Sequence, residues 1–429
     1  PPAELYQRPQ TEFVASFLGT ANLMVGEVTA EGVRLGPVRF PLSTEAGPMR
    51  EAQRVQVLFR PEDVALAPAA DGLTAAPLGK AEVEEQSFVG SFERLRLRLP
   101  TLPGVRPIAP AVPFGSDSLL IEATRSQEQA RRFPLKPGDG AWIGVHRLHA
   151  LTHPGLRFLI VADASPEGEA ALAVGGQIAR LAHARTTLLG SGDTPENAER
   201  RLQAAREALG SGLPALDTIV ARSASSIEVA RAVERDPTDL VVLGATSETA
   251  AETAEQHLRA GEHHLLLVPR DGPVPARLLI CIASGEPGKD DVHFAGRLAR
   301  HLGAEVTLLS VLPPEGDQPQ ARVRIERFLQ AGVRSLALLG IAATIRIRVG
   351  AVFDEVTDEM TGGGHDLLVI GAPLSERDGH LAFAGVAGQL VSHATTYPVL
   401  IVRSRYALGN QRWIARNGRI NILSEEVIR

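Results

Sequence analysis

The sequence predicts a multidomain protein, in which an all-β N-terminal part precedes two α/β domains, each with a doubly wound parallel sheet. Three observations support this fold class. Short alternating or apolar segments, broken by Gly and Pro, dominate residues 21–152. From about residue 155 onward, apolar runs alternate with amphipathic helices. This second pattern then occurs a second time.

The segments within residues 21–152 have the spacing of small antiparallel barrels. They include LMVGEVTAEGVRLG, RVQVLFRPEDVAL and AWIGVHRLHAL. Leucine and arginine alternate in Leu95–Pro100, so a strand there places leucines on one face and arginines on the other. We expect a half-exposed strand. A nucleic-acid interface is the less favoured interpretation, because no aromatic side chains accompany the arginines.

The α/β part is internally repeated. RFLIVAD (157–163) corresponds to RLLICIA (277–283), and IARLAHARTTLL corresponds to LARHLGAEVTLL, both at an offset of 120 positions. DLVVLGA and DLLVIGA are offset by 127 positions, so the second copy carries a short insertion. Apolar runs of this kind, DTIVA (217–221) among them, predict strands buried on both faces of a parallel sheet. Pro269–Pro275 (PRDGPVP) cannot continue a helix or strand and predicts the boundary between two tandem domains.

Composition narrows the function classes. The formal net charge of −6 gives no general attraction to nucleic acid or to anionic lipid. Cys281 is the one cysteine, which rules out disulfides within the chain and favours a reducing, cytoplasmic setting. No apolar run approaches the roughly 20 residues that cross a bilayer. We therefore expect a cytoplasmic protein with no nucleic-acid partner.

Two segments imitate phosphate-binding motifs. VGGQIARLAHAR (174–185) is similar to the signature of ABC ATPases, but a helix starting at Ser165 and Pro166 places its glycines in mid-helix, without free N–H groups. ASGEPGKDD (283–291) is similar to a P-loop, but Asp290 stands where a hydroxyl would hold Mg²⁺. We interpret them as a packed helix and an ordinary strand-to-helix turn. The sequence has no Gly-x-Ser-x-Gly elbow, and we expect no catalytic residues and no metal site.

The first 150 residues resemble the C-terminal TOBE region of ABC importer ATP-binding subunits of the polyamine, iron and phosphonate type. The resemblance rests on PAELYQRPQTEFVASFLGTANLMVGEV, VLFRPEDVALAP and FPLKPGDGAWIGV. It implies a remnant at residues 1–20 that follows a missing nucleotide-binding domain, and an OB-like β-barrel region at 21–152. An upstream ABC domain would make the full-length protein an ATPase. The resemblance also implies two kinds of partner, the permease subunits and a second ATP-binding subunit, and a peripheral location at the inner face of the cytoplasmic membrane.

Residues 156–270 and 276–404 resemble two tandem universal stress protein domains, with the UspA-like, adenine nucleotide alpha hydrolase-like fold. The resemblance rests on RFLIVADASPEGEAAL, LVVLGATSE and HLLLVP in the first copy, and on RLLICIASGE, LLVIGAP, FAGVAGQLVSHA and YPVLIV in the second. ATP-binding members of that family have an Asp after the first strand and Gly-x2-Gly-x9-Gly-Ser/Thr after the fourth. The residues here that match parts of this pattern are Asp163, Gly244, Gly371, Gly379 and Gly385.

Each copy thus keeps a different half of a nucleotide site, because Ala283 replaces the Asp in the second copy and the first copy lacks the later glycines. The resemblance implies at most weak binding of ATP or AMP. It also implies dimerisation through the last strand, either in a homodimer or between the two copies of one chain. We assign no function to the tail at 405–429.

Taken together, the two resemblances imply a regulatory and non-catalytic chain: the C-terminal portion of an importer ATP-binding subunit, fused to two degenerate stress-protein domains that sense a ligand. The alternative is a stand-alone nucleotide-binding universal stress protein with a vestigial TOBE region.

Overall fold

The computed structural model describes residues 6, 9, 15, 19–41, 54–110, 112–152, 155–210, 213, 216–259, 261, 263–282, 286–372, 375–377, 380–382, 385–393 and 397–403. The chain divides into two compact units. The first unit comprises residues 1–155 with 330–342, and the second comprises residues 156–329 with 343–429. Most of the predicted remnant at 1–20 and the whole tail at 405–429 lie outside the described residues.

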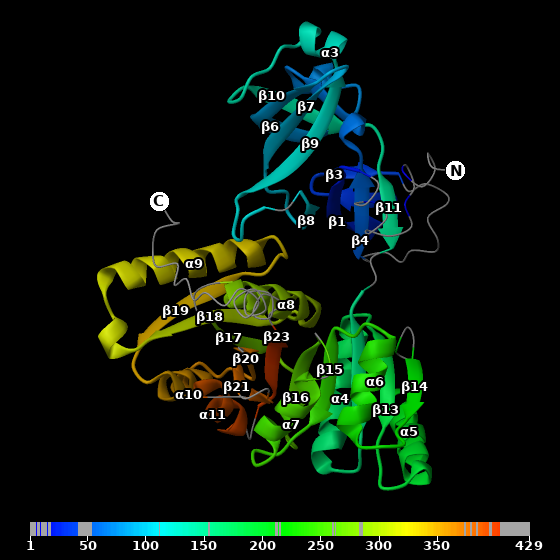
Figure 1. Ribbon diagram of the computed structural model, residues 1–429, viewed down its shortest axis with the longest axis vertical. Coiled ribbons are helices and arrows are strands. Elements are labelled where there is room, and N and C mark those ends of the chain that lie inside the picture. Colours follow the sequence, from blue (N-terminus) through cyan, green and yellow to red (C-terminus); the bar gives the residue numbers. More distant parts are fainter. Residues whose placement is uncertain are drawn as a thin grey trace. The chain divides into compact units, whose positions relative to one another are not determined.

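The first unit contains two antiparallel sheets (Figure 1). One has the strand order β11-β4-β1-β2-β3, with β8 also pairing with β1; the other has the order β5-β10-β6-β7-β9. The strands are β1 (Asn22–Thr29), β2 (Gly32–Leu35), β3 (Val38–Phe40), β4 (Arg54–Phe59), β5 (Val64–Ala67), β6 (Ala76–Val89), β7 (Phe92–Pro100), β8 (Arg106–Ala109), β9 (Ser118–Ser126), β10 (Gly140–Val145) and β11 (His149–Thr152). The short helices are η1 (Pro61–Asp63), η2 (Ala70–Gly72) and α3 (Gln127–Arg132).

Both sheets contribute side chains to one hydrophobic core, which explains why their strands alternate in polarity. The predicted alternation in β7 is confirmed: Leu95, Leu97 and Leu99 are buried. The arginines between them pair with carboxylates, Arg96 with Glu122 and Arg98 with Glu84. These ion pairs fit the interpretation that Arg96 and Arg98 lie on the solvated face of β7.

The second unit is built on one sheet of ten strands, in the order β14-β13-β12-β15-β16-β23-β20-β17-β18-β19 (Figure 1). These strands are β12 (Arg157–Ala162), β13 (Arg185–Gly190), β14 (Leu216–Val220), β15 (Leu240–Gly244), β16 (His264–Val268), β17 (Arg277–Cys281), β18 (Glu305–Leu312), β19 (Ala343–Val349), β20 (Leu367–Ala372) and β23 (Val399–Arg403). A separate hairpin joins β21 (Ser375–Arg377) to β22 (His380–Ala382).

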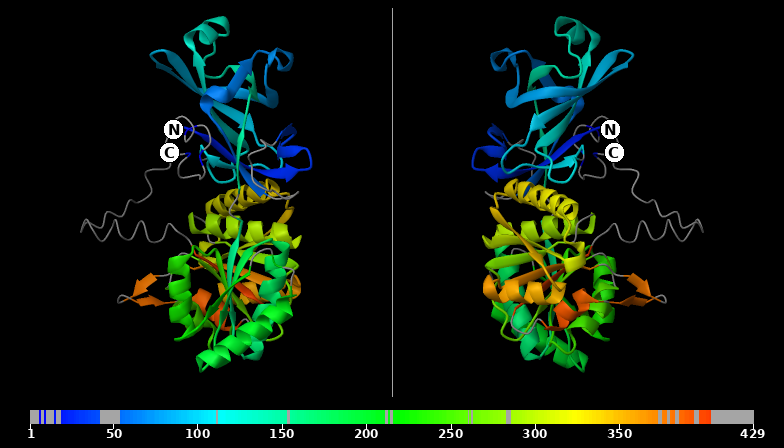
Figure 2. Two further views of the ribbon diagram at one scale, coloured as in Figure 1. Left: turned by 90° about the vertical axis from the view of Figure 1, so that its right-hand side faces the viewer. Right: turned by 90° about the vertical axis from the view of Figure 1, so that its left-hand side faces the viewer.

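Helices cover both faces of the ten-stranded sheet (Figure 2). Helices α4, α5 and α8 contact its strands from one face. On the other face, side chains of α6, α7, α10 and α11 join alternate strand residues in a core that runs through both repeats. The helices are α4 (Pro166–Leu181), α5 (Pro195–Leu209), α6 (Ser225–Arg235), α7 (Ala250–Leu258), α8 (Glu286–Leu302), η4 (Pro314–Gly316), α9 (Pro319–Ala337), α10 (Val352–Gly362) and α11 (Val386–His393).

The two copies meet at their last strands. All pairings in the sheet are parallel except that of β16 with β23, which is antiparallel, with Leu266 opposite Leu400. The pairing that the family resemblance placed between two last strands therefore occurs within this one chain. The copies share both the sheet and a core cluster, so they form one structural unit.

The glycine pair of VGGQ lies inside α4, as predicted, and close packing explains it. Ser165 caps the helix by accepting a hydrogen bond from the Gly168 amide, and Pro166 occupies its first turn. A Cβ on Gly175 would lie 3.0 Å from Val242, and one on Gly176 would lie 2.2 Å from Leu209. The glycines therefore allow α4 to pack closely on the sheet and on α5.

One predicted buried strand is instead an edge strand. The run DTIVA suggested a strand covered on both faces, yet Asp217 and Thr218 of β14 are exposed, because β14 ends the sheet and has one strand neighbour. Within the described part of the chain, none of the helices combines the length and the hydrophobicity that a membrane-spanning helix needs.

Candidate functional site

A cavity of about 590 Å³ lies at the carboxyl ends of β12, β13 and β14 in the first copy. Ligands of open α/β sheets bind at this edge, where loops leave the strands. The loop after each strand contributes to the lining, so residues far apart in the sequence meet here. The lining residues are Asp163, Ala164, Ser165, Ser191, Gly192, Asp193, Thr194, Pro195, Asn197, Arg201, Ala221, Arg222, Ser223 and Ala224.

Asp163 is thus placed in a cavity, directly after β12. Its Oδ1 accepts two hydrogen bonds from Ser165, one from the amide at 2.8 Å and one from the hydroxyl at 2.6 Å. The same hydroxyl accepts from the Gly168 amide at 2.9 Å. The carboxylate is therefore held against the first turn of α4, where backbone N–H groups and the helix dipole stabilise negative charge.

Glycine at position 168 makes this arrangement possible. A Cβ there would lie 2.1 Å from Oδ1 of Asp163, far inside van der Waals contact. Any larger side chain would force the carboxylate away from the helix. Gly168 was not among the predicted site residues, because its role depends on a contact that spacing in the sequence does not reveal.

Gly244, the last residue of β15, packs against α4 and does not line the cavity. A Cβ on Gly244 would lie 2.3 Å from the carbonyl carbon of Glu167. The structure therefore brings Asp163 and Gly244 to the same turn of α4. Close packing of Gly244 on that turn explains why a glycine stands there.

The corresponding glycine of the second copy, Gly371, lies against a buried carboxyl group. A Cβ there would lie 2.8 Å from Oδ2 of Asp291, which is 3% exposed. Burial, together with the nearby charge of Asp290, raises the pKa of Asp291 well above its usual value. The site therefore favours a neutral acid over a carboxylate.

The other residues of the second copy that the sequence analysis singled out are Gly385, Gly379, Ala283 and Cys281. Gly385 has a φ of +72°, which favours glycine, and directly precedes α11. Gly379 and Ala283 lie outside the described residues. Cys281 ends β17, and burial raises the pKa of its thiol, which keeps it protonated and a poor nucleophile.

Two arginines that sequence reasoning missed line the Asp163 cavity. Arg201 comes from α5 and Arg222 from the loop after β14. That loop is anchored by Glu228, which accepts hydrogen bonds from the Ser223 hydroxyl and the Arg222 amide. The hydrogen bond from Ser223 lowers the pKa of Glu228 and keeps it an anionic anchor. The cavity thus combines carboxylates, hydroxyls and two guanidinium groups that suit a ligand with anionic and polar parts.

Among the described residues, no group of three or more His, Cys, Asp or Glu side chains has the arrangement of a metal site.

The fold and the cavity can now be compared with known proteins. Residues 276–403 match the universal stress protein family. This match covers the second copy. The first copy has the same strand pairings in the same register, at offsets of 120 and 127 positions. The C-terminal part of the chain therefore has a UspA-like α/β fold.

Solved structures of universal stress proteins match parts of this chain. A universal stress protein from Archaeoglobus fulgidus is 14% identical, with a TM-score of 0.46, over 58% of this chain and 96% of that one. A protein of the universal stress protein family from Burkholderia pseudomallei is 17% identical, with a TM-score of 0.25, over 31% of this chain and 97% of that one.

The N-terminal part is similar to importer ATP-binding proteins. A sulfate/thiosulfate import ATP-binding protein from Chromobacterium violaceum is 32% identical over 158 residues, 36% of this chain and 37% of that protein. A spermidine/putrescine import ATP-binding protein from Rubrobacter xylanophilus is 36% identical over 164 residues, with the same two shares. The chain thus spans little more than a third of these relatives.

Proposed function

We propose that this chain is the regulatory portion of an ABC importer ATP-binding subunit, in which two α/β copies sense a ligand. One observation carries the proposal: a single polypeptide combines similarity to importer ATP-binding subunits with a universal stress protein match. In this proposal residues 21–152 form TOBE or OB-like barrels, and residues 156–270 and 276–404 form two stress-protein domains.

This role makes the described region a binding and regulatory module and not an enzyme. The geometry supports this assignment, since the buried thiol of Cys281 is kept protonated and the VGGQ glycines serve packing. Its partners would be permease subunits and a second ATP-binding subunit, at the inner face of the cytoplasmic membrane. Any ATP hydrolysis would belong to an ABC domain outside this sequence.

Affinity purification of the full chain from its native cells tests the partners. We expect a permease and an ATP-binding cassette protein, identified by mass spectrometry, to be recovered with the chain in amounts comparable to it. A matched bait that carries Arg206→Gln, an exposed change on α5, should recover the same proteins. Recovery of neither protein from cells that express the chain contradicts the proposal.

We further propose that the cavity beside Asp163 is where an adenine nucleotide binds. Its volume of about 590 Å³ suits a small ligand, and Arg201 and Arg222 could pair with phosphate. Asp163 would then accept hydrogen bonds from the base or ribose. This binding is also what the alternative, a stand-alone nucleotide-binding stress protein, requires.

Calorimetric titration of the full chain with ATP, ADP and AMP tests this site. We expect weak binding that Asp163→Ala and Arg222→Gln each reduce by about tenfold, because each removes a charged hydrogen-bonding partner. Gly385→Val, in the second copy, should leave this binding unchanged, which would locate the site in the first copy. No heat at millimolar nucleotide would eliminate both this site and the stand-alone alternative, while leaving the importer partners to be tested separately.

A further inference from the structure

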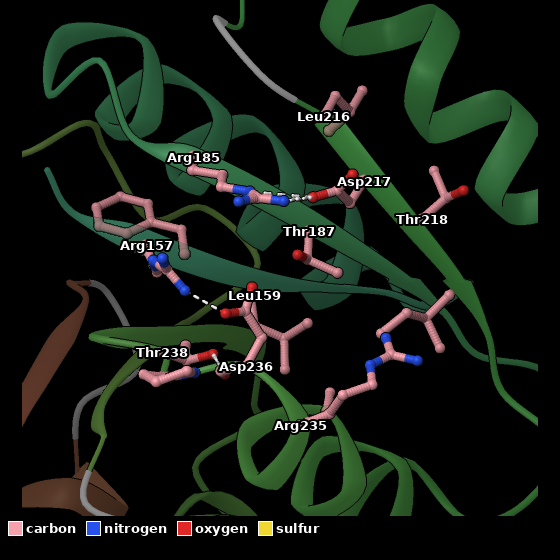
Figure 3. A pocket seen from close by; sticks show the side chains of 14 residues that line it. Arg157, Leu159, Arg185, Thr187, Leu216, Asp217, Thr218, Arg235, Asp236 and Thr238 are labelled. Carbon is pink, nitrogen blue, oxygen red and sulfur yellow. Dashed lines mark hydrogen bonds and ion pairs between the residues drawn. The ribbon is translucent and has the colours of Figure 1, made fainter. Parts of the chain in front are cut away.

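The first copy has another cavity at the opposite edge of the sheet, at the amino ends of β12, β13 and β14 (Figure 3). Its volume is about 480 Å³, within the range of roughly 300–1,000 Å³ typical of small-molecule sites. It is separate from the Asp163 cavity, with which it shares no lining residue. The nucleotide proposed above therefore does not account for it.

Three arginines line this second cavity, which we call the arginine cavity: Arg157, Arg185 and Arg235 (Figure 3). Arg157 forms an ion pair with Asp236, and Arg185 forms one with Asp217 at 3.0 Å. No ion pair of Arg235 is found within the described part of the chain, and its side chain is exposed. The lining thus has one positive charge more than it has negative charges.

Hydroxyl groups and apolar side chains complete the lining. Thr187 of β13 contributes a hydroxyl, and Leu159 and Ile219 provide apolar surface beside it. A compact organic molecule with one anionic group would satisfy this mixture, since its anion would meet a guanidinium and its carbon skeleton would meet the apolar side chains.

The second copy supplies a template for that anionic group. Register identifies equivalent positions, because β13 pairs with β14 as β18 pairs with β19, at offsets of 120 and 127 positions. By the same offset of 127, helix α10 corresponds to α6, and Glu359 is the equivalent of Ala232. Where the first copy has a methyl group beside a cavity, the second copy has a carboxylate.

Arginines hold the Glu359 carboxylate in the second copy. Arg348 lies 2.7 Å from one of its oxygens, and Arg346 lies 3.8 Å from the other. His365 lies 3.6 Å from the carboxylate. Glu359 is 6% exposed, so the second copy fills this place with its own acidic side chain. By the same offset, Arg346 and Arg348 are the equivalents of Ile219 and Ala221, so the first copy lacks both the carboxylate and the two arginines that hold it.

We propose that the arginine cavity binds a small organic carboxylate, whose anionic group takes the place beside Ala232 that Glu359 occupies in the second copy. Arg235 is its principal charged partner, with the hydroxyl of Thr187 in reach of the rest of the ligand. The two copies have thereby diverged: one is closed by its own side chain, and the other is open to a ligand.

Calorimetric titration of the full chain with succinate and with citrate tests the proposal, with inorganic phosphate as the comparison anion. We expect saturable binding of at least one carboxylate, in preference to phosphate. Ala232→Glu should abolish it, because the new side chain would fill the cavity as Glu359 fills its own site. Arg235→Gln, an exposed change that leaves the fold intact, should weaken binding by about tenfold or more.

Arg206→Gln, on the exposed side of α5 and outside both cavities, is the matched control and should leave binding unchanged. Three outcomes would overturn the proposal. They are the absence of carboxylate binding at millimolar concentration, binding that survives both Arg235→Gln and Ala232→Glu, and binding of phosphate in place of carboxylates. ATP titration of the same variants shows independently whether the Asp163 cavity remains intact.

Discussion

His263 directly precedes β16, where the two copies meet, and its imidazole is 1% exposed. Burial, and the positive charge of nearby Arg403, lower the pKa of His263 from 6.5 to about 4. Burial also lowers the pKa of His257, the other titratable group that affects His263. Both histidines therefore favour the neutral form in the folded chain.

This shift predicts a loss of stability in acid. The unfolded chain binds a proton at His263 below about pH 6.5, while the folded chain resists it until about pH 4, so stability falls as the pH drops through that window. The shift corresponds to about 3 kcal/mol of unfolding free energy. Urea denaturation at pH 7, 5.5 and 4.5 should show this decline, and His263→Leu should make it markedly shallower.

The exposed His146 provides the control, because His146→Gln should leave the pH dependence of stability as it is in the unsubstituted chain. An equally steep decline in His263→Leu would show that other groups are responsible for it.

Gly168→Ala is predicted to disturb the Asp163 cavity. The added Cβ would lie 2.1 Å from Oδ1 of Asp163, so the carboxylate must leave Ser165. We expect a loss of about 1–3 kcal/mol in unfolding free energy, because hydrogen bonds to a charged group are broken. Gly362→Ala is the matched change in α10, where a Cβ meets nothing within 4 Å, and it should be neutral or stabilise by up to ~1 kcal/mol. Thermal denaturation compares the two, and equal stability of both variants would contradict the role assigned to Gly168.

Asp163 was predicted as a site residue from the family resemblance, and the structure places it in the lining of a cavity; Arg201 and Arg222, which line the same cavity, were not predicted. An acid directly after an apolar strand is visible in a short segment of sequence. The two arginines join it only because α5 and the loop after β14 fold over the same edge, which local patterns do not reveal. Gly244 and Gly371 were predicted as nucleotide-binding residues. In the structure they are in close packing contact with α4 and with Asp291, respectively.

At the scale of elements, Asn22 links the two sheets of the first unit. It lies at the start of β1, fully buried, and its side chain bonds to the backbone of Glu122 in β9. Asn22 Nδ2 donates to the Glu122 carbonyl and Asn22 Oδ1 accepts from the Glu122 amide, both at 2.8 Å. The side-chain amide of Asn22 thus satisfies both backbone groups of Glu122, as a neighbouring strand would.

Asn22→Ala should lower the unfolding free energy by about 2–4 kcal/mol, since two buried backbone groups lose their partners. Asn22→Asp keeps an acceptor for the Glu122 amide but places a charge against its carbonyl, so it should be at least as destabilising. Chemical denaturation, followed by the fluorescence of Trp142 in β10, measures the effect on this unit. A change below about 0.5 kcal/mol in both variants would show that the sheets do not depend on this link.

Elements could be predicted where the signal was local. The start of α4 follows from Ser165 and Pro166, and the alternation of β7 follows from Leu95–Pro100. Leu181 is apolar but 39% exposed, because α4 ends there. The exposure of β14 was likewise missed, since the position of a strand in its sheet depends on pairings that its own residues do not specify.

At the scale of the molecule, self-similarity predicted two copies of one α/β pattern, and the structure joins them in a single sheet through β16 and β23. The repeat was visible as offsets of 120 and 127 positions. The shared sheet followed only from the family resemblance, because the residues of the last strands, HLLLV and VLIVR, are as apolar as those of any interior strand.

We propose that the described part of this chain binds and regulates, and does not catalyse. Phosphate release from ATP by the purified chain tests it most directly, at millimolar ATP and with Mg²⁺ present. We expect release equal to that of a buffer blank, for the chain and for Asp163→Ala alike. Saturable release above the blank that Asp163→Ala abolishes would contradict it.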